Sequence, residues 1–253
     1  MRKAILLCGL LLVAATGSAS AAGVSLHWND CTSGGGVQNL NFACDDDLAS
    51  FSATGQFRMP APLNGVTGIE LSLDLATAGP TLPAWWQFNE GQCRATNLSL
   101  NADTTGKVGC PDWAGGTALG GLATYTEGSS SPNTAHILGG FAVGPPRNLT
   151  DLTQNFFAFN LVILADNTTA GGSKGVACGG CDLAACIVFN QINVVTPFPL
   201  PLFEVKISNS ELPGGNFITW QGGAGVNSSL GQGCPAATPT RKSTWGELKS
   251  LYR

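Results

Sequence analysis

Charged residues are scarce in this chain. Only 11% of its residues are charged, and the 16 acidic residues outnumber the 12 basic ones. A protein that binds nucleic acid needs a basic patch that releases counterions from the phosphates, and no stretch of the sequence provides one. Glycine, serine, threonine and asparagine are abundant instead, as in extracellular β proteins with polar, neutral surfaces. The composition therefore disfavours nucleic acid as a partner.

No apolar run is long enough for a comfortable membrane span. The run at Ala4–Ala15 is short against roughly 30 Å of bilayer hydrocarbon. It follows the basic Arg2-Lys3 and precedes small residues at 17–22, which is the order of a secretory signal peptide. We therefore expect residues 1–22 to be a signal, cleaved after Ala21 or Ala22, which takes the formal charge from −4 to −6 because Arg2 and Lys3 are lost. The sequence predicts export to the cell exterior, with the periplasm as the alternative, and no transmembrane segment after signal removal.

Histidine is also rare, which limits imidazole chemistry to His27 and His136. Residues 171–175 satisfy the G-x-S-x-G pattern around Ser173. That pattern has meaning where a strand turns sharply into a helix and exposes the serine, whereas here a cysteine-rich turn follows. Nothing in the sequence places either histidine beside Ser173, so we interpret the match as coincidence and predict a protein without a catalytic constellation.

Cysteine, by contrast, is plentiful. The sequence has nine cysteines, and eight remain once Cys8 is removed with the signal. An even number in an exported chain predicts a disulfide framework. Each bridge contributes about 2–4 kcal/mol to the free energy of unfolding. Short loops favour Cys31–Cys44 and Cys93–Cys110, although eight cysteines allow 105 pairings. Those two bonds would leave four cysteines, the clustered Cys178, Cys181 and Cys186 together with Cys234, to form the remaining two. The eight cysteines that remain after removal of Cys8 with the signal are Cys31, Cys44, Cys93, Cys110, Cys178, Cys181, Cys186 and Cys234.

Three further patterns offer metal, redox or acid–base chemistry. Cys178 and Cys181 form a CxxC motif that we expect to be structural, with a zinc or redox role as the alternative. The turn Asp45-Asp46-Asp47 offers oxygens to Ca²⁺, but one segment cannot supply the 6–8 ligands that the ion takes. Glu70 and Asp74 have the spacing of a glycosidase acid pair, yet a half-exposed strand normally carries charge there. We therefore predict no cofactor, and Ca²⁺ is the one ion to test.

Alternation of apolar and polar residues indicates strands. In Gly68–Leu75 an isoleucine and three leucines alternate with polar residues, so one face is buried and the other wet. Asn155–Ala165 is apolar on both faces, which predicts a central strand covered on both sides. About ten such strands, with turn residues at short intervals, predict an all-β protein. The expected fold is a disulfide-stapled antiparallel β-sandwich, jelly-roll-like, forming one domain over residues 23–221.

Aromatic side chains are the best binding candidates. Trp85, Trp86, Trp113 and Tyr125 offer rings for stacking on sugars. The alternative is burial in the core, and because adjacent residues of a strand face opposite ways, we expect one of Trp85 and Trp86 to point inward.

The end of the chain differs in kind. Residues 222–240 are rich in glycine and proline and predict a flexible arm. Residues 241–253 form the tail, in which Trp245–Tyr252 is predicted to be a short amphipathic helix. Thr244 and Glu247 fit the capping-box spacing. A helix this short is marginal alone, so we expect it to dock on its own sandwich or on a partner. The docking residues at helical spacing are Trp245, Leu248, Leu251 and Tyr252.

Four segments carry a resemblance to other proteins: Leu82–Phe88, Cys186–Ile192, Asn216–Gly223 and above all Cys234–Arg253. The chain resembles a group of uncharacterised exported bacterial proteins that share the W-W pair, the cysteine layout and the T-W-G-x-x-K-x-L-Y-R ending. The resemblance covers nearly the whole mature chain and is most specific in the tail. It implies bacterial export and a single domain, and it transfers no activity, ligand or catalytic residue.

Two functional hypotheses follow. The first is a secreted, non-enzymatic structural or interaction protein whose terminal helix is a docking or sorting element. The second is a carbohydrate-binding module that uses exposed tryptophans. The expected partner is thus an unidentified protein or a glycan at the cell exterior.

Overall fold

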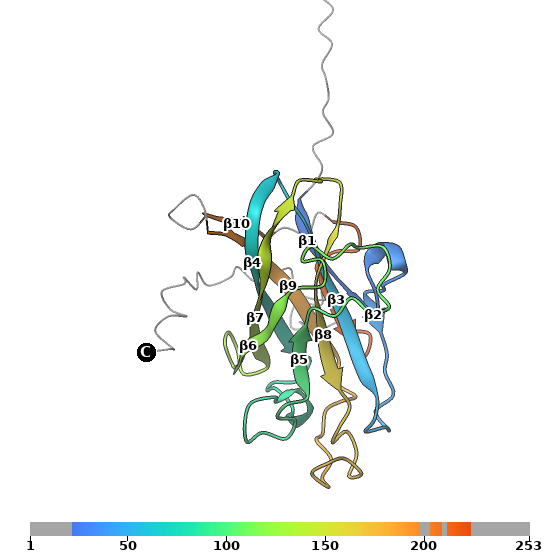
Figure 1. Cartoon of the computed structure of the whole chain (residues 1–253). Coiled ribbons are helices and arrows are strands. Elements are labelled where there is room, and N and C mark those ends of the chain that lie inside the picture. Colours follow the sequence, from blue (N-terminus) through green and yellow to red (C-terminus); the bar gives the residue numbers. More distant parts are fainter. Residues whose placement is uncertain (1–21, 198–202, 209–211, 224–253) are drawn as a thin grey trace, which may run out of the picture.

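Strands dominate the computed structural model, which describes residues 22–197, 203–208 and 212–223 (Figure 1). Eleven strands form two sheets, accompanied by the short 3₁₀ helices η1 (Thr32–Gly34) and η2 (Ala84–Trp86). The smaller sheet has the order β1 (Gly23–Trp28), β3 (Ser50–Arg58), β8 (Phe156–Leu164), β5 (Leu98–Asn101). The larger sheet has the order β2 (Asn39–Leu40), β11 (Phe217–Trp220), β9 (Ala185–Thr196), β4 (Leu63–Thr77), β7 (Thr134–Leu149), β6 (Leu119–Glu127), with β10 (Phe203–Ile207) also paired to β9.

The prediction of an all-β protein with two sheets is confirmed. Within the described residues, paired strands run antiparallel except β2 and β11, which run parallel. The sheets hold four and seven strands, whereas a jelly roll divides eight strands between two sheets. Strand β1 lies at an edge of the smaller sheet, and the described residues form no helix that is long and apolar enough to cross a membrane.

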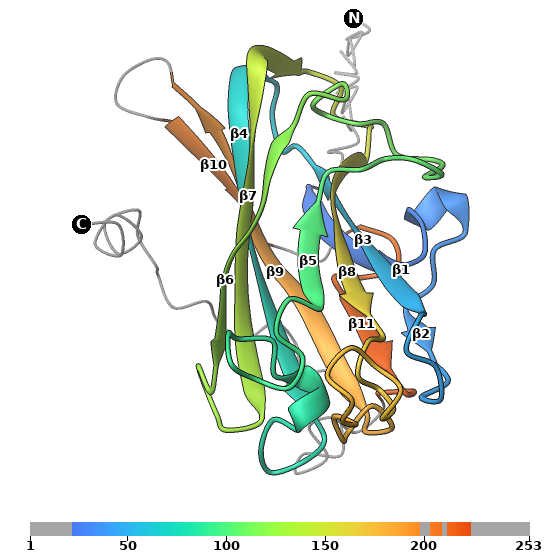
Figure 2. The same cartoon turned by 60° about the horizontal axis from the view of Figure 1, so that its bottom comes forward.

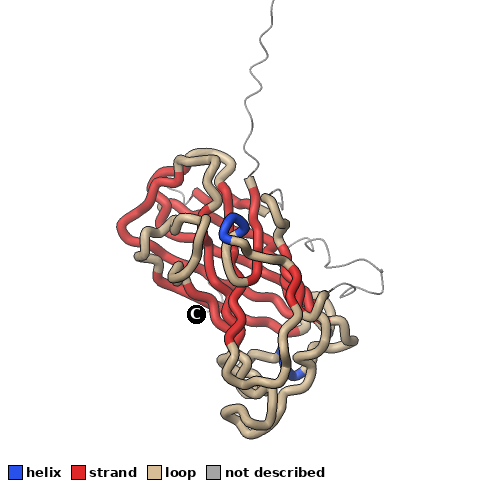
Figure 3. Tube along the Cα trace, turned by 90° about the vertical axis from the view of Figure 1, so that its right-hand side faces the viewer, coloured by secondary structure: helices blue, strands red, loops and turns tan. Residues whose placement is uncertain are grey.

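The core lies between the two sheets. Figure 2 shows β5, β8 and β3 on one side and β6, β7 and β4 on the other. Strand β4 contributes the apolar residues of its predicted alternation, and its neighbours on both sides are β7 and β9. Phe159 of the smaller sheet meets Phe189 of the larger one edge to face, with ring centroids 5.0 Å apart. One continuous cluster joins both sheets, while loops gather at both ends of the strands (Figure 3).

Strand β8 confirms the predicted central position of Asn155–Ala165, and it confirms the predicted cover on both sides only in part. It lies between β3 and β5, with Phe159 and Leu161 in the core between the sheets. Phe157 points to the opposite side and packs against the disulfide of Cys31 and Cys110. A disulfide-linked pair of loops therefore covers the second apolar face at Phe157, whereas Leu164 at the other end of the strand is 42% exposed.

The segment Ala84–Phe88, whose two tryptophans we expected on a strand, is not a strand. Ala84–Trp86 forms a 3₁₀ helix instead. Pro83 precedes it in an extended conformation, and its carbonyl accepts the hydrogen bond of the Trp86 N–H. The strand-based expectation that only one of Trp85 and Trp86 points inward is wrong, since the tight turn buries both.

The short-loop disulfide pairings are also wrong. The bonds join Cys31 to Cys110, Cys44 to Cys181, and Cys93 to Cys178, at sequence separations of 79, 137 and 85 residues. Loop-closure entropy rises only slowly with loop length, so the sandwich topology, which brings distant strand ends together, determines the pairing. These bonds indicate an oxidising compartment. Residues 1–21 and the helix predicted at Trp245–Tyr252 lie outside the described residues, so the signal peptide and the terminal helix remain predictions.

Candidate interaction face

The larger sheet presents polar side chains on the side away from the core. In β4, the residues between the core leucines are Glu70, Ser72 and Asp74. Directly paired residues of neighbouring strands share a face, so His136 of β7 lies beside Asp74, and Asn193 of β9 lies beside Glu70. We call this surface the outer face and define its polar part by Glu70, Ser72, Asp74, His136, Asn190, Gln191 and Asn193.

Asp74 is the centre of a hydrogen-bonded group that spans three neighbouring strands. Its Oδ1 lies 2.6 Å from His136 Nδ1, and its Oδ2 accepts a hydrogen bond of 2.6 Å from Asn190 Nδ2. The register between β4 and β9 shifts next to Ser72, where Asn190 is the additional residue of β9. Such a bulge re-aims a side chain, and here it directs Asn190 onto Asp74. The carboxylate is therefore held from both sides while the His136 and Asp74 side chains stay 25% and 26% exposed.

The acidic end of the outer face lies beside β10. Burial raises the pKa of Glu70, and repulsion by Glu204 of β10 raises it further, while a hydrogen bond with Asn193 acts in the opposite direction. Two buried polar atoms of the outer face, Ser72 Oγ and Asn190 Oδ1, have no hydrogen-bond partner. Buried polar atoms normally have one, so these two atoms are exceptions within the sheet, and neither is accessible to a partner on the surface.

An apolar corner adjoins the polar part where β4, β9 and β11 meet. Its buried members are Ala76, Cys186 and Val188, with Ala184 and Phe217 packed against them. These residues alternate with core residues along β9, so they lie on the outer side of the sheet. The central members of this corner, Ala76, Cys186 and Val188, are buried, so the partly exposed polar group is the part of the outer face that is open to a partner.

The Asp74–His136 pair alone does not amount to a hydrolytic site. Nucleophilic catalysis needs a hydroxyl or thiol within hydrogen-bond reach of the imidazole. Among the described residues, the His136 ring is hydrogen-bonded to Asp74, which is a carboxylate and not a hydroxyl or thiol. The sequence-based pairing of Glu70 with Asp74 as glycosidase acids also finds no support, because Asp74 is engaged by His136 and Asn190.

The four aromatic binding candidates are not exposed. The relative exposures of Trp85, Trp86, Trp113 and Tyr125 are 0%, 0%, 3% and 9%. Trp85 Nε1 donates a hydrogen bond to Thr168 Oγ1, and the Tyr125 hydroxyl donates to the backbone carbonyl of Trp86. The rings therefore offer no free face for stacking on a sugar. The prediction that these four aromatic side chains are exposed for binding is wrong.

The remaining sequence motifs have structural roles. Ser173 donates its hydroxyl hydrogen bond to Asp166, which fits the interpretation of G-x-S-x-G as coincidence. The two CxxC sulfurs bond to Cys44 and Cys93, not to each other, as expected for structural cysteines. Asp47 accepts hydrogen bonds from Thr169, which lower its pKa. Within the described parts of the chain, no group of three His, Cys, Asp or Glu side chains is placed to hold a metal ion.

Sequence analysis missed two buried polar groups. The guanidinium carbon of Arg94 lies 3.9 Å from the centroid of the Trp85 ring, and burial lowers the pKa of Arg94 to about 10. Asp166 contributes a smaller opposing effect. Arg94 Nη2 donates to the carbonyl of Leu164, while Nε and Nη1 have no partner. No local pattern predicts this burial, because Arg94 follows Cys93 in a segment whose sequence is typical of a loop.

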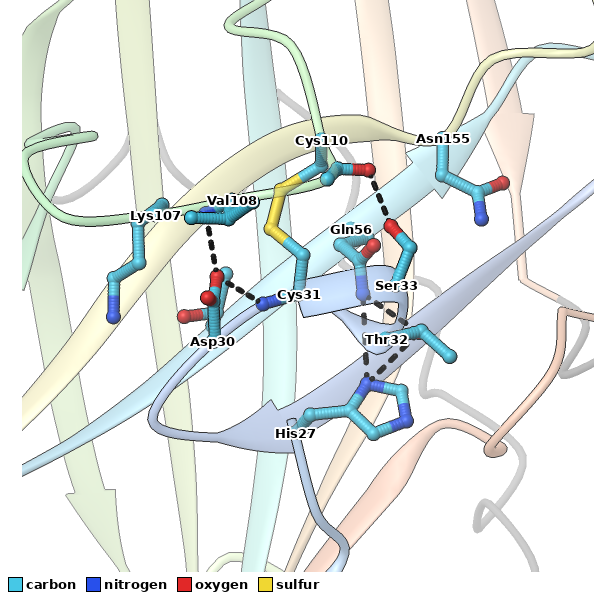
Figure 4. Close-up of a disulfide and its surroundings, with 12 residues drawn as sticks. His27, Asp30, Cys31, Thr32, Ser33, Gln56, Lys107, Val108, Cys110 and Asn155 are labelled. Atoms are coloured by element: carbon cyan, nitrogen blue, oxygen red, sulfur yellow. Dashed lines mark hydrogen bonds between the residues drawn. A yellow bond between two sulfur atoms is a disulfide. The ribbon is translucent and has the colours of Figure 1, made fainter. Parts of the chain in front are cut away.

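The second missed group surrounds His27 on the outer side of the smaller sheet (Figure 4). Thr32 Oγ1 and Gln56 Nε2 lie 3.3 and 3.5 Å from His27 Nδ1. The nearby disulfide of Cys31 and Cys110 covers this region together with the loops that it joins. The group contributes to packing under a loop, and its position is remote in the fold from the outer face, which belongs to the other sheet.

Comparisons with known proteins do not assign the chain to a family. Its sequence matches no protein-family model and no curated protein. A cohesin module from a family 33 glycoside hydrolase of Clostridium perfringens ATCC13124 aligns with 74% of this chain and 95% of its own, at 9% identity and a TM-score of 0.31. A putative membrane anchored protein from Corynebacterium diphtheriae aligns with 88% of this chain but 38% of its own, at 11% identity and a TM-score of 0.25. Scores this low establish neither a shared fold nor a shared function.

Proposed function

We propose that this chain is an exported, non-enzymatic interaction or structural protein of the cell exterior. Its outer face is the recognition surface, and its terminal helix is a docking or sorting element. The observation that carries the proposal is the group formed by Asp74, His136 and Asn190, three side chains from three neighbouring strands held by hydrogen bonds of 2.6 Å. Asp74 and His136 are partly exposed, and the buried Asn190 holds Asp74 in place.

Rigidity supports a binding role for this surface. A partner that meets side chains already held in place loses less conformational entropy on binding. Sites built on sheet strands are also held more precisely than sites on loops. The side chains of the outer face project from β4, β7 and β9, and β4 pairs with β7 on one side and with β9 on the other in the middle of the larger sheet.

Charge indicates the kind of partner. The polar part contains Glu70 and Asp74, with Glu204 of β10 close enough to affect the pKa of Glu70. An acidic, hydrogen-bonding surface favours a protein partner that presents basic or hydrogen-donating side chains. Because the candidate aromatic rings are buried, the structure lends no support to sugar stacking, and we do not propose it.

The outer face is tested with a triple variant, Glu70→Gln with Asp74→Asn and His136→Gln. We expect it to lose partner complexes that form on formaldehyde cross-linking of the source bacterium, because the charges and the fixed geometry are removed. The matched control, Asp103→Asn with Asp151→Asn, changes two carboxylates whose acceptor roles are to nearby threonines. Retention of the complexes in the triple variant, or equal loss in both, contradicts the role of the outer face.

The terminal helix is tested separately. Alanine at Trp245, Leu248, Leu251 and Tyr252 should change localisation or partner association while leaving the melting temperature nearly unchanged. The control replaces Glu247 and Lys249, on the charged side of the predicted helix, with alanine. Cell fractionation and thermal unfolding measure the two effects, and unchanged secretion and association in the apolar variant would remove the docking role.

A further inference from the structure

Cys186 points away from the core. Along β9, Ala185 and Ile187 belong to the core between the sheets, whereas Cys186 belongs to the apolar corner with Ala76 and Val188. This is the alternation of side chains expected in a strand. Cys186 is nevertheless only 1% exposed. The sulfur of Cys186 is therefore covered on the outer face of the larger sheet.

The partner of Cys186 follows by elimination. Cys186 is disulfide-bonded, and the other six described cysteines pair with one another. The sequence has nine cysteines, so Cys8 and Cys234 are the remaining ones. Cys8 belongs to the predicted signal peptide, which is removed on export. We propose that Cys186 is bonded to Cys234, and that this bond ties the chain's own C-terminal segment to the apolar corner of the outer face.

The described chain ends beside this corner. Strand β11 pairs with β9 so that Thr219 lies opposite Cys186 and Trp220 lies opposite Ala185. Three residues later the chain is still close, because a Cβ atom placed on Gly223 would lie 2.3 Å from Thr219 Cβ and 2.9 Å from the Ala185 carbonyl oxygen. Residues 224–233 span up to about 35 Å when extended. The connection is thus long enough to return Cys234 to Cys186.

The apolar corner fits this occupant chemically. Its surroundings are Ala76, Val188 and Phe217, which form a small surface without charge. The segment at Cys234 continues as Pro235-Ala236-Ala237. Small, apolar residues of this kind can cover a small apolar area and place only modest side chains against it. The rest of the chain, residues 238–253, would then begin from a fixed point on the outer face.

Formation of the bond is a two-electron oxidation. The thiolate of one cysteine attacks a disulfide of the exporting compartment, either a protein oxidant or a low-molecular-weight disulfide, and one of that disulfide's sulfurs leaves as a thiolate. The second cysteine thiolate attacks the resulting mixed disulfide and releases the other sulfur of the oxidant. Cys186 and Cys234 together lose two electrons and two protons, and the oxidant is reduced to two thiols.

Peptide mapping without reduction tests the bond in the exported full chain. Cleavage after Lys174, Lys206 and Arg241, combined with cleavage before Asp182, separates Cys186 from the CxxC cysteines. The two products, Asp182–Lys206 and Ile207–Arg241, each contain one cysteine. We expect a single species with the summed mass of both peptides less two hydrogens, which dithiothreitol splits into two.

Variants distinguish this bond from the others. In Cys186→Ser, the thiol of Cys234 should become available to iodoacetamide after unfolding without reductant, and in Cys234→Ser the thiol of Cys186 should. The control Cys93→Ser should release Cys178 and leave the peptide pair linked. Alkylation of Cys186 in the unreduced wild type, a link from Cys234 to another cysteine, or a link from Cys186 to Cys8 would overturn the proposal. None of these outcomes bears on whether the outer face binds a partner, so the two proposals can fail separately.

Discussion

At the scale of single residues, burial has its clearest effect at His27. The ring lies against the Thr32 hydroxyl and the Gln56 amide, and its Nε2 is buried without a hydrogen-bond partner. Burial lowers the pKa of His27 below the ordinary value of 6.5. A group whose pKa is lower in the folded state than in the unfolded state binds fewer protons when folded, so acid favours unfolding. The stability that depends on a neutral ring is complete above the unfolded pKa and declines as the pH falls through it toward the folded pKa.

This predicts a pH dependence that can be assigned to one side chain. The wild type should lose more free energy of unfolding than His27→Gln as the pH is lowered from about 7 to about 5, because glutamine cannot take up a proton. Urea denaturation at a series of pH values measures both curves. The carboxylates titrate in both proteins, so the difference between the curves isolates His27. Parallel curves would show that His27 does not titrate differently in the two states.

At the scale of elements, the loops around Cys31 and Cys110 act as a cover for the smaller sheet. Asp30 Oδ1 accepts hydrogen bonds from the N–H groups of Cys31 and Val108, at 2.6 and 2.9 Å, so one carboxylate joins both loops. Ser33 Oγ adds a hydrogen bond of 2.6 Å to the Gly109 carbonyl (Figure 4). Beneath them, Phe157 of β8 packs against the disulfide. The element that covers β8 is thus assembled from two short loops that the disulfide holds together.

Removal of this disulfide should be costly. We expect Cys31→Ala with Cys110→Ala to lower the free energy of unfolding by about 2–5 kcal/mol, because the bond restricts the unfolded chain and its loss uncovers Phe157. Guanidinium denaturation measures the change. The matched control, Ser33→Ala, removes one hydrogen bond between the same loops and should cost about 0.5–1.5 kcal/mol. A double cysteine variant no less stable than this control would contradict the role of the disulfide.

At the scale of the whole molecule, Trp220 joins parts of the chain that are distant in sequence. Its ring centroid lies 4.2 Å from that of Phe42, 4.7 Å from that of Trp85 and 6.0 Å from that of Trp28. Its Nε1 donates a hydrogen bond of 2.6 Å to the carbonyl of Cys181. Trp220 therefore connects the first strand, the 3₁₀ helix η2 and the cysteine cluster at one end of the sandwich.

Truncation of this ring should destabilise the entire sandwich. Trp220→Ala is expected to lower the free energy of unfolding by about 3–5 kcal/mol, as is typical of a large buried aromatic side chain. The control Leu48→Ala, at a side chain that is 93% exposed, should stay within about 0.5 kcal/mol of the wild type. Chemical denaturation followed by tryptophan fluorescence and by far-ultraviolet circular dichroism measures both. A small effect of Trp220→Ala would mean that the ring cluster is not essential to the fold.

Local pattern in the sequence was sufficient to place two of the strands. The alternation in Gly68–Leu75 identified the middle of β4, and the apolar run Asn155–Ala165 identified β8 as a central strand. These predictions succeed because the period of a strand is a property of the backbone and is visible in neighbouring residues. The same reasoning failed at Ala84–Phe88, where the hydrogen bond from Trp86 N–H to the Pro83 carbonyl favours a 3₁₀ helix that buries both tryptophans.

The sequence by itself determined the class of fold and the positions of strands such as Gly68–Leu75, because both follow from composition and from residues a few positions apart. The tertiary structure alone decided the disulfide partners, the burial of the tryptophans and the grouping of Asp74, His136 and Asn190. The physical reason is that each of these depends on strand order and register between segments separated by tens of residues. No local pattern carries that information, since hydrogen-bonded pairing across the sheets places these side chains beside one another.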